Sequence, residues 1–233
     1  MVDYTKCALY KMESKKKLFD LLFIEKHSLD LLINNYNVYI KDGKRIIEEC
    51  KPNLKLVHSR IFYLLKRLEL PNYLYSKKGS AYYDNYKPHL SNDYFYMLDI
   101  EKFFPKSSSF FVYQMFLNKF KMSSDVAQLI TRICTIDKEQ VYLNNEVLEW
   151  YQRIESQINF SIPQRHIPTG SPISQVLAFL AFEDMFNEIE IYCKNSNLSF
   201  SVFVDDLTIS SQKPISERVI YDIKNILLKY NHY

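Results

Sequence analysis

The sequence predicts an α+β fold with an antiparallel sheet. The chain has 233 residues, of which 47% are apolar and 15% are aromatic, so it can bury a sizeable core. Its periodic segments run in the order strand, helices, long helix, β-hairpin, helix. Runs of this kind, rather than regular β-α alternation, are typical of helices packed on an antiparallel sheet.

The first half of the chain predicts helices around one hairpin. Residues 14–33 show helical periodicity, and Glu25 interrupts the apolar face, which favours a bent or split helix near Ser28. The stretch YNVYIKDGKRIIEECKP predicts a hairpin that turns at Asp42-Gly43. A basic helix follows from about Lys55 to Leu70.

The second half begins with DYFYMLDI, whose alternation predicts a strand with Asp99 on the same face as Phe95 and Met97. Two helices are expected next, one ending near Phe120 and one over 124–135. Residues 137–165 are polar, and we expect an irregular, exposed excursion.

A long helix is predicted to begin at Ser171, as N-cap, with Pro172 in the first helical position, and to run to about Lys194. A hairpin that turns at Asp205-Asp206 follows. The last helix is expected over about 215–228.

Composition narrows the class of protein. No apolar run reaches the roughly 18 to 20 residues that a membrane span needs, and the N-terminus lacks the apolar core of a signal peptide. The four cysteines are scattered without zinc-site spacing, which favours reduced thiols in a cytoplasmic protein.

Charge is distributed unevenly along the chain. Residues 1–92 hold 17 Lys/Arg against 10 Asp/Glu, whereas residues 93–233 hold 13 against 17. This asymmetry suits a protein that holds a polyanion with one part and metal ions with the other, although ordinary surface variation explains it equally well.

Three segments carry candidate chemistry. Asp205-Asp206 taken alone indicates a polar turn more often than a site. Asp99, taken alone, fits either a buried ion pair with a lysine or a metal ligand. If its strand neighbours the hairpin, the Asp99 carboxylate lies one strand spacing, about 4.8 Å, from the acid pair. The three carboxylates then repel one another unless a cation such as Mg²⁺ lies among them. IPTGSPISQ holds Gly170 at a helix start that is able to bind phosphate, or is a plain helix start.

Together and in this order, the three segments resemble reverse transcriptases. FVDD is similar to the Tyr-x-Asp-Asp catalytic turn, LDIEKFF to the first aspartate motif of the palm, and IPTGSPISQVLAFL to the motif that supports template and incoming nucleotide. The retron and antiviral-defence enzymes of bacteria are the most similar, over roughly residues 36–215.

The resemblance implies a right-hand polymerase of fingers and palm, with an antiparallel palm sheet backed by helices. It assigns an N-terminal region and fingers to 1–92, palm to 93–120, a fingers return with an insertion to 121–165, and palm to 166–233. The thumb and lysine motif of the family are not recognised after the expected palm helix. A protein partner or a further segment is expected to supply the grip on the duplex.

The resemblance also implies roles for individual residues. Asp99, Asp205 and Asp206 would be catalytic and would hold two Mg²⁺ ions, with Mn²⁺ as a substitute and the Ile100 carbonyl as a further ligand. Nucleotide contacts are expected from Phe104, which would exclude a 2′-hydroxyl, and from Thr169, Gly170, Ser171, Lys77 and Lys78. Nucleic-acid contacts are expected from Lys44, Arg45, Tyr82, Tyr83 and Phe203. The basic residues fit a solvated surface equally well, and Phe104, Tyr82 and Tyr83 also fit a core.

The implied activity is RNA-directed DNA synthesis from dNTPs on a structured noncoding RNA, in a retron or anti-phage system, without a membrane. Phe203 departs from the family, where tyrosine is usual. Ile47 stands where the fingers hairpin usually has an arginine. Two rival functions remain open: a template-independent or protein-primed polymerase, and a non-catalytic RNA-binding assembly subunit.

Overall fold

The computed structural model describes residues 2–25, 29–43, 45–77, 79, 82–141, 145–158 and 161–232. The chain forms two compact units and passes between them four times. Unit 1 comprises Met1–Asp3, Glu69–Phe103 and Phe179–Tyr233, and unit 2 comprises Tyr4–Leu68 and Phe104–Ala178. Both contain helices and antiparallel strands, which is compatible with the α+β class. The polymerase arrangement and the fingers and palm boundaries stay predictions.

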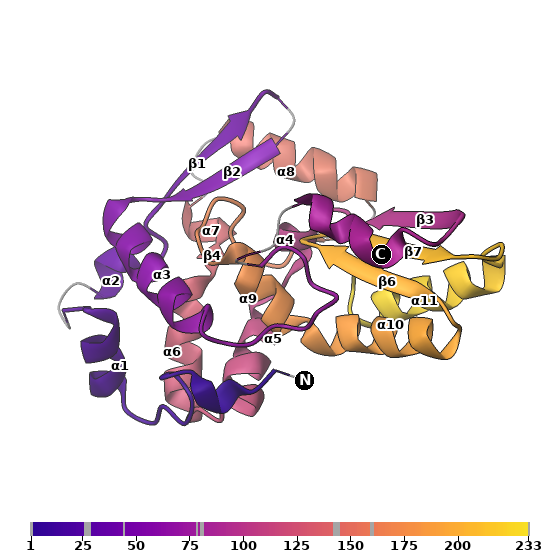
Figure 1. Cartoon of the computed structure of the whole chain (residues 1–233). Helices are drawn as coiled ribbons and strands as arrows, with labels where there is room; N and C mark the ends of the chain where they lie inside the picture. Colours follow the sequence, from indigo (N-terminus) through magenta and orange to yellow (C-terminus); the bar gives the residue numbers. More distant parts are fainter. Residues whose placement is uncertain are drawn as a thin grey trace. The chain divides into compact units, whose positions relative to one another are not determined.

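Unit 1 is built on a three-stranded antiparallel sheet in the order β3-β7-β6 (Figure 1). Its strands are β3 (Tyr94–Asp99), β6 (Ser199–Phe203) and β7 (Asp206–Ser211). Alternation sends Leu207 and Ile209 of β7 into the core, where they are fully buried. Helices α10 (Glu183–Asn195) and α11 (Glu217–Lys229) lie along that face of the sheet.

The opposite face of the sheet carries the polar side chains of β7. The 3₁₀ helix η3 (Tyr82–His89) covers part of this face, because His89 bonds to Ser201 and Ser210 there. The outer edge of β6 pairs with residues 73–75 through the amide of Tyr75 and the carbonyl of Val202. β3 forms the other edge, and its Phe95 and Met97 side chains are exposed.

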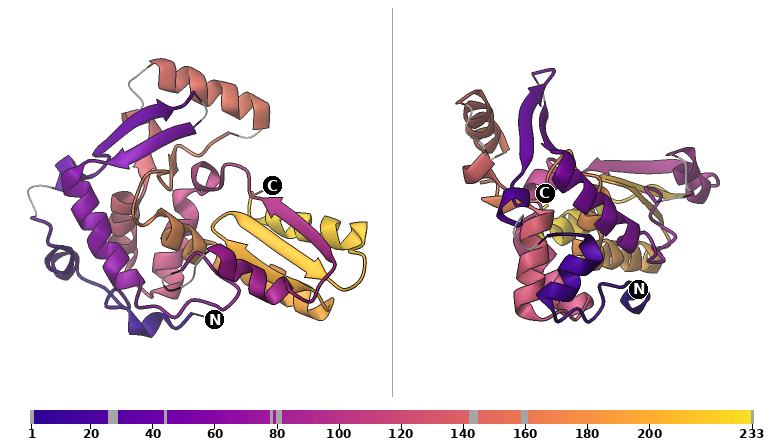
Figure 2. Two further views of the ribbon diagram at one scale, coloured as in Figure 1. Left: turned by 45° about the horizontal axis from the view of Figure 1, so that its top comes forward. Right: turned by 90° about the vertical axis from the view of Figure 1, so that its left-hand side faces the viewer.

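Unit 2 combines a hairpin with packed helices. The hairpin pairs β1 (Tyr36–Lys41) with β2 (Arg45–Cys50), and Figure 2 shows α8 beside it. The helices and short strands of this unit are η1 (Tyr4–Lys6), α1 (Lys15–Leu22), α2 (Leu29–Leu32), α3 (Pro52–Leu65), α4 (Phe103–Lys106), α5 (Ser109–Gln114), the π-helix η4 (Met115–Lys119), α6 (Ser124–Cys134), β4 (Ile136–Asp137), α7 (Lys138–Val141), α8 (Asn145–Ile158) and β5 (Arg165–His166). Phe103 itself belongs to unit 1, and α9 (Ser174–Ala181) passes from unit 2 into unit 1.

Most of the predicted elements occur, including the split of the first helix into α1 and α2. Two predictions about helix ends were wrong. The basic helix begins at Pro52 rather than near Lys55, since proline fits the first helical turn, and it ends at Leu65. The long helix begins at Ser174 instead of Ser171 and is interrupted at Phe182, whose backbone leaves the helical conformation.

The largest error concerns residues 137–165, which are not an irregular, exposed excursion. Most of this stretch is helical, in α7 and α8. The described side chains of α8 that face inward are Val147, Trp150, Tyr151 and Ile154, all buried. Their spacing of three and four residues is that of an amphipathic helix, which the many polar residues around them obscured.

The four cysteines are free and buried. Within the described ranges, no helix is both long and apolar enough to cross a membrane.

Candidate active site

The β6-β7 hairpin turns at Val204 and Asp205, between the paired residues Phe203 and Asp206. Val204 has a φ of 61°, a left-handed conformation that is unfavourable for a β-branched residue. Its amide donates to the Ser76 hydroxyl at 3.1 Å, which helps to hold the turn. The predicted hairpin is therefore confirmed, but its strained two-residue turn lies one residue earlier than predicted, so that Asp206 is the first residue of β7.

Strand register brings the first aspartate to the hairpin. Asp99, the last residue of β3, is the direct cross-strand partner of Asp206. The amide of Ile100 donates to the Asp205 carbonyl at 3.0 Å, which fixes the turn against the end of β3. The described structure of unit 1 thus gathers Asp99, Ile100, Asp205 and Asp206 at one end of its sheet.

Electrostatics at this end of the sheet disfavour a second negative charge. The pKa of Asp206 is raised, mainly by partial burial and to a smaller extent by the nearby Asp99 carboxylate. Within the described ranges, no side chain donates a hydrogen bond to Asp99 or Asp206 that would offset the repulsion. The two charges are therefore better accommodated with a cation between them.

The donor atoms suit Mg²⁺, because carboxylate and carbonyl oxygens are the hard ligands that this ion prefers. Among the described residues, however, no three or more His, Cys, Asp or Glu side chains lie close enough together to hold a metal ion. The fit therefore rests on the paired carboxylates of Asp99 and Asp206, with Asp205 adjacent in the turn. Mg²⁺ binding at these residues stays a prediction.

A buried histidine that the sequence did not single out braces the hairpin. His89 is 2% exposed, and its two ring nitrogens lie 2.6 Å from the Ser210 hydroxyl and 2.8 Å from the Ser201 hydroxyl. The Asn92 amide donates to Ser199 and Ser210. Burial lowers the pKa of His89, so the ring is neutral near pH 7 and joins η3 to the strands that carry the aspartates.

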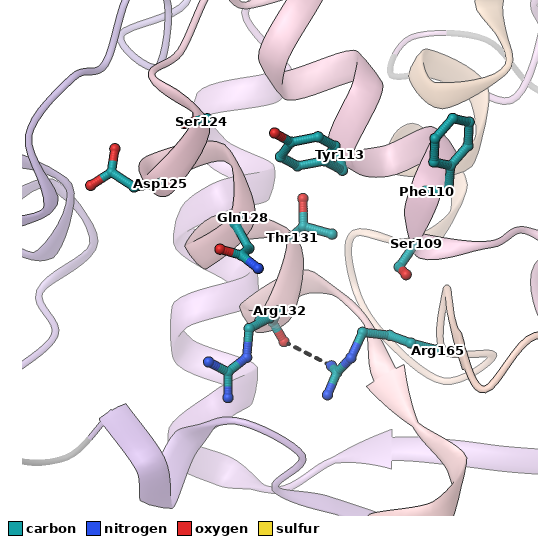
Figure 3. A pocket seen from close by; sticks show the side chains of 9 residues that line it. All are labelled: Ser109, Phe110, Tyr113, Ser124, Asp125, Gln128, Thr131, Arg132 and Arg165. Carbon is teal, nitrogen blue, oxygen red and sulfur yellow. Dashed lines mark hydrogen bonds between the residues drawn. The ribbon is translucent and has the colours of Figure 1, made fainter.

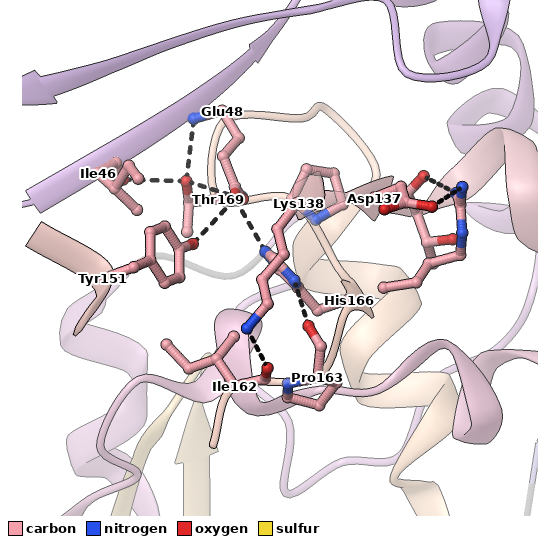
Figure 4. A network of polar contacts seen from close by, with 12 residues as sticks. Ile46, Glu48, Asp137, Lys138, Tyr151, Ile162, Pro163, His166 and Thr169 are labelled. Atoms are coloured by element: carbon pink, nitrogen blue, oxygen red, sulfur yellow. Dashed lines mark hydrogen bonds and ion pairs between the residues drawn. The ribbon is translucent and has the colours of Figure 1, made fainter. Parts of the chain in front are cut away.

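In unit 2, the predicted nucleotide motif is anchored by a buried glutamate (Figure 4). Glu48 Oε1 accepts from the Tyr151 hydroxyl at 3.1 Å and from His166 Nε2 at 2.8 Å. Glu48 Oε2 accepts from the Thr169 amide at 2.9 Å. The Thr169 hydroxyl donates to the Ile46 carbonyl and accepts from the Glu48 amide. The loop is thereby fixed to β2.

Gly170 is required by close packing on the same strand. A Cβ at this position would lie 2.9 Å from the Glu48 carbonyl oxygen and 3.1 Å from the Glu49 Cα. Both are backbone atoms and cannot move away, so any side chain would displace the loop. The glycine therefore lets Thr169 and Ser171 lie directly against the hairpin of unit 2.

Ser171 is held by a hydrogen bond to the His58 side chain. Its hydroxyl lies 2.6 Å from His58 Nδ1, while His58 Nε2 donates to the Ile133 carbonyl at 2.8 Å. Burial lowers the pKa of His58 to about 4, so the ring is neutral and Nδ1 accepts the Ser171 proton. The Ser171 hydroxyl is thus committed to the protein interior as well as lying in the predicted nucleotide motif.

The remaining predicted site residues are distributed over both units. Lys77 donates to the carbonyls of Leu70 and Pro71 in unit 1, and burial lowers its pKa. Arg45 and Tyr83 are exposed, and Phe203 and Phe104 are half-buried. Lys44 and Lys78 lie outside the described residues, as does the side chain of Tyr82. The roles of all these residues stay predictions.

Figure 3 shows a separate open cavity of about 670 Å³ in unit 2, between α5 and α6. Its wall includes Tyr113, Arg132 and Arg165. Both terminal nitrogens of Arg165 are engaged, since Nη1 donates to the carbonyls of Arg132 and Thr135 and Nη2 pairs with Asp137. This guanidinium therefore braces β5 against the end of α6.

Glu48, His58 and His89 were missed because their partners are remote in sequence. The residues that bond to Glu48 lie 103 to 121 positions away. No local pattern assigns a partner to such a glutamate. The available signal was weak: Glu48 directly follows Ile46 and Ile47 on its strand.

Comparison with known proteins supports the motif-based resemblance. The chain is 28% identical over 214 residues to the retron Se72 reverse transcriptase of Salmonella heidelberg, a match that covers 87% of this chain. The matched region is 49% of the relative, so the chain spans about half the length of that protein. No family model matches the chain. The resemblance to retron-type reverse transcriptases is confirmed by this relationship.

Proposed function

We propose that this chain carries the polymerase centre of a retron-type reverse transcriptase, and that it joins dNTPs to a primer 3′-hydroxyl on an RNA template. The observation that carries the proposal is the pairing of Asp99 with Asp206 across neighbouring strands, beside the turn that holds Asp205. The similarity to the Se72 enzyme supports the same conclusion.

In the proposed reaction, Asp99, Asp205 and Asp206 would hold the ions, with the Ile100 carbonyl as a further ligand. Two bound Mg²⁺ ions would activate the attacking hydroxyl and neutralise charge on the leaving pyrophosphate. The chain itself positions the carboxylates before substrate binds. The backbone that carries them is held by the Val204 turn, by its contact with Ser76 and by the Ile100 amide.

Nucleotide selection is proposed for Phe104 and for the loop at Thr169, Gly170 and Ser171. The loop is held by Glu48 and His58, so its backbone is ordered in advance of binding. A bulky ring at Phe104, five residues after Asp99, would exclude a 2′-hydroxyl and favour deoxynucleotides. We further propose a structured noncoding RNA as template and a role in a retron defence system.

The test is dNTP incorporation on an RNA template by the Asp205→Asn/Asp206→Asn variant. Loss of the ions' charge stabilisation should lower incorporation by more than about a hundredfold. Glu101→Gln is the control, because it removes one exposed carboxylate two residues after Asp99 and should leave the rate unchanged. Equal rates for the double variant and the wild-type chain would refute the proposal.

Two further measurements, product sequencing and RNA binding in EDTA, separate the rival functions. A product whose sequence ignores the template would indicate template-independent or protein-primed synthesis. RNA binding that persists in EDTA, with no synthesis under any condition, would indicate an assembly subunit.

A further inference from the structure

An exposed tyrosine on α3 gathers three cations around its ring. Tyr63 is 42% exposed. The Lys66 ammonium lies 4.4 Å from the ring centroid, the Arg67 guanidinium 4.9 Å and the Arg60 guanidinium 5.6 Å. Arg60 precedes Tyr63 by one helical turn on α3, and Lys66 and Arg67 directly follow the last helical residue, Leu65. We call these four residues the Tyr63 cluster.

Two of the three cations in the Tyr63 cluster are held in place by hydrogen bonds. Arg67 Nη2 donates to the Tyr63 hydroxyl at 3.3 Å, and Arg60 Nε donates to the Leu21 carbonyl at 3.0 Å. In the part of the chain that the structure describes, no carboxylate forms an ion pair with Arg60, Lys66 or Arg67. Three positive charges around one ring repel one another, and an anionic partner would relieve that repulsion.

An apolar groove adjoins the cluster within unit 2. It has a volume of about 550 Å³, and its wall includes Phe23, Glu25, Leu31, Asn53, Leu56 and Arg60. Phe23, Leu31 and Leu56 are 77%, 76% and 71% exposed, which is unusual for large apolar side chains that lie together. Arg60 links the groove to the cluster, because its guanidinium lies 4.7 Å from the Phe23 ring centroid.

We propose that this surface binds single-stranded RNA, with phosphates on the Tyr63 cluster and an unpaired base in the groove. The inference rests on the proposed function for the identity of the polyanion, and it adds a binding surface outside the residues assigned to catalysis. Fixed guanidinium groups suit phosphate, and exposed aromatic and apolar side chains suit the face of a base. A duplex keeps its bases stacked inside and cannot fill the groove.

The test is fluorescence anisotropy of a labelled twelve-nucleotide uridine RNA, titrated with the purified chain in EDTA. Lys66→Gln/Arg67→Gln should weaken binding about tenfold or more. It should also reduce the salt dependence, log Kd against log salt, by about 1.4, since each phosphate contact to a single strand contributes about 0.7. Lys16→Gln/Lys17→Gln is the charge-matched control on α1, where both lysines are exposed, and should change Kd less than about twofold.

A second variant tests the groove separately from the charges. Leu56→Ser, an exposed position that the core does not need, should weaken binding of the uridine RNA but not of a twelve-base-pair RNA duplex. The proposal is overturned if the lysine control loses as much affinity as the cluster variant. It is also overturned if the duplex binds as tightly as the single strand, or if an acidic peptide such as oligoglutamate competes as well as RNA, which would indicate a protein partner.

Because the assay contains neither dNTP nor metal ion, it fails or succeeds independently of polymerase activity. Suppose that primer extension is lost in Asp205→Asn/Asp206→Asn but the cluster variant binds RNA as the wild type does. The proposed RNA-binding surface would then be refuted, and the proposed function would stand. Absence of extension by the wild-type chain, together with RNA binding that depends on the cluster, would overturn the proposed function alone.

Discussion

Glu48 and Asp206 are carboxylates in comparable positions, each on a strand of an antiparallel hairpin, yet the two units hold them in opposite ways. Glu48 in unit 2 is fully buried and accepts hydrogen bonds from Tyr151, His166 and the Thr169 amide. Asp206 in unit 1 is half-buried and faces Asp99. A carboxylate whose donors are built into the protein stabilises a loop, whereas one that faces another carboxylate is left with a charge that a cation can neutralise.

The largest effect is expected from removing the buried carboxylate. Glu48→Ala leaves the Tyr151, His166 and Thr169 donors without an acceptor and should lower the free energy of unfolding by about 3 to 5 kcal/mol. Urea denaturation followed by circular dichroism measures this. Glu49→Ala is the control on the same strand: its pairing with Lys55 at 3.7 Å is partly exposed, and its loss should cost less than about 1 kcal/mol. An equal loss of unfolding free energy in the two variants would contradict the assignment of a stabilising role to Glu48.

Gly170→Ala tests how firmly the loop next to Glu48 is packed on β2. The added Cβ meets backbone of Glu48 and Glu49, so we expect a loss of about 1 to 3 kcal/mol in the free energy of unfolding. Gly43→Ala offers a contrast, because it meets nothing within 4 Å and carries only the penalty of its φ of 65°, about 1 kcal/mol. A cost at Gly170 no greater than that at Gly43 would mean that the loop can move away from β2.

The opposite behaviour is expected at Asp206. Its raised pKa means that the folded chain binds this proton more tightly than the unfolded chain does, so stability is lost as the pH rises through that pKa. Asp206→Asn removes this penalty. Without divalent ions, the variant should gain melting temperature relative to wild type between pH 4 and pH 7.

Metal addition completes that test. Mg²⁺ should raise the melting temperature of the wild-type chain at pH 7 and leave Asp206→Asn unchanged, because the variant lacks the charge that the ion would neutralise. Glu101→Gln should respond as the wild type does. A variant that is stabilised by Mg²⁺ as strongly as the wild type would show that the ion binds elsewhere.

The smallest effect is expected in the turn itself. Val204→Gly relieves the left-handed strain but makes the unfolded chain more flexible, so the net gain should be below about 1 kcal/mol. Val204→Ala keeps a Cβ and most of the strain, and should gain less than the glycine variant. Thermal melts of the two variants at one pH, in EDTA, measure the difference. A more stable alanine variant would contradict the assignment of strain to this residue.

The two sides of the comparison also differ in how far the sequence predicted them. The Asp205-Asp206 hairpin and the strand that ends at Asp99 follow from local alternation and turn residues, and the structure confirms both elements. The Glu48 network could not be predicted, because its members meet only through tertiary folding. Helix α8 had a readable apolar spacing at Val147, Trp150, Tyr151 and Ile154, which its polar residues concealed.

The passage of the chain between the units has a consequence for synthesis on the ribosome. All residues of unit 2 have been synthesised once the ribosome reaches Ala178, before β6 and β7 exist. Strand β3, in contrast, ends at Asp99 and cannot pair until synthesis reaches Asp206 and the rest of β7. At cellular rates of about 5 to 20 residues per second, this delay is roughly 5 to 20 s. During that interval an apolar strand lacks its partner, so the nascent chain has a window in which chaperone binding or misassociation competes with completion of the acidic hairpin site.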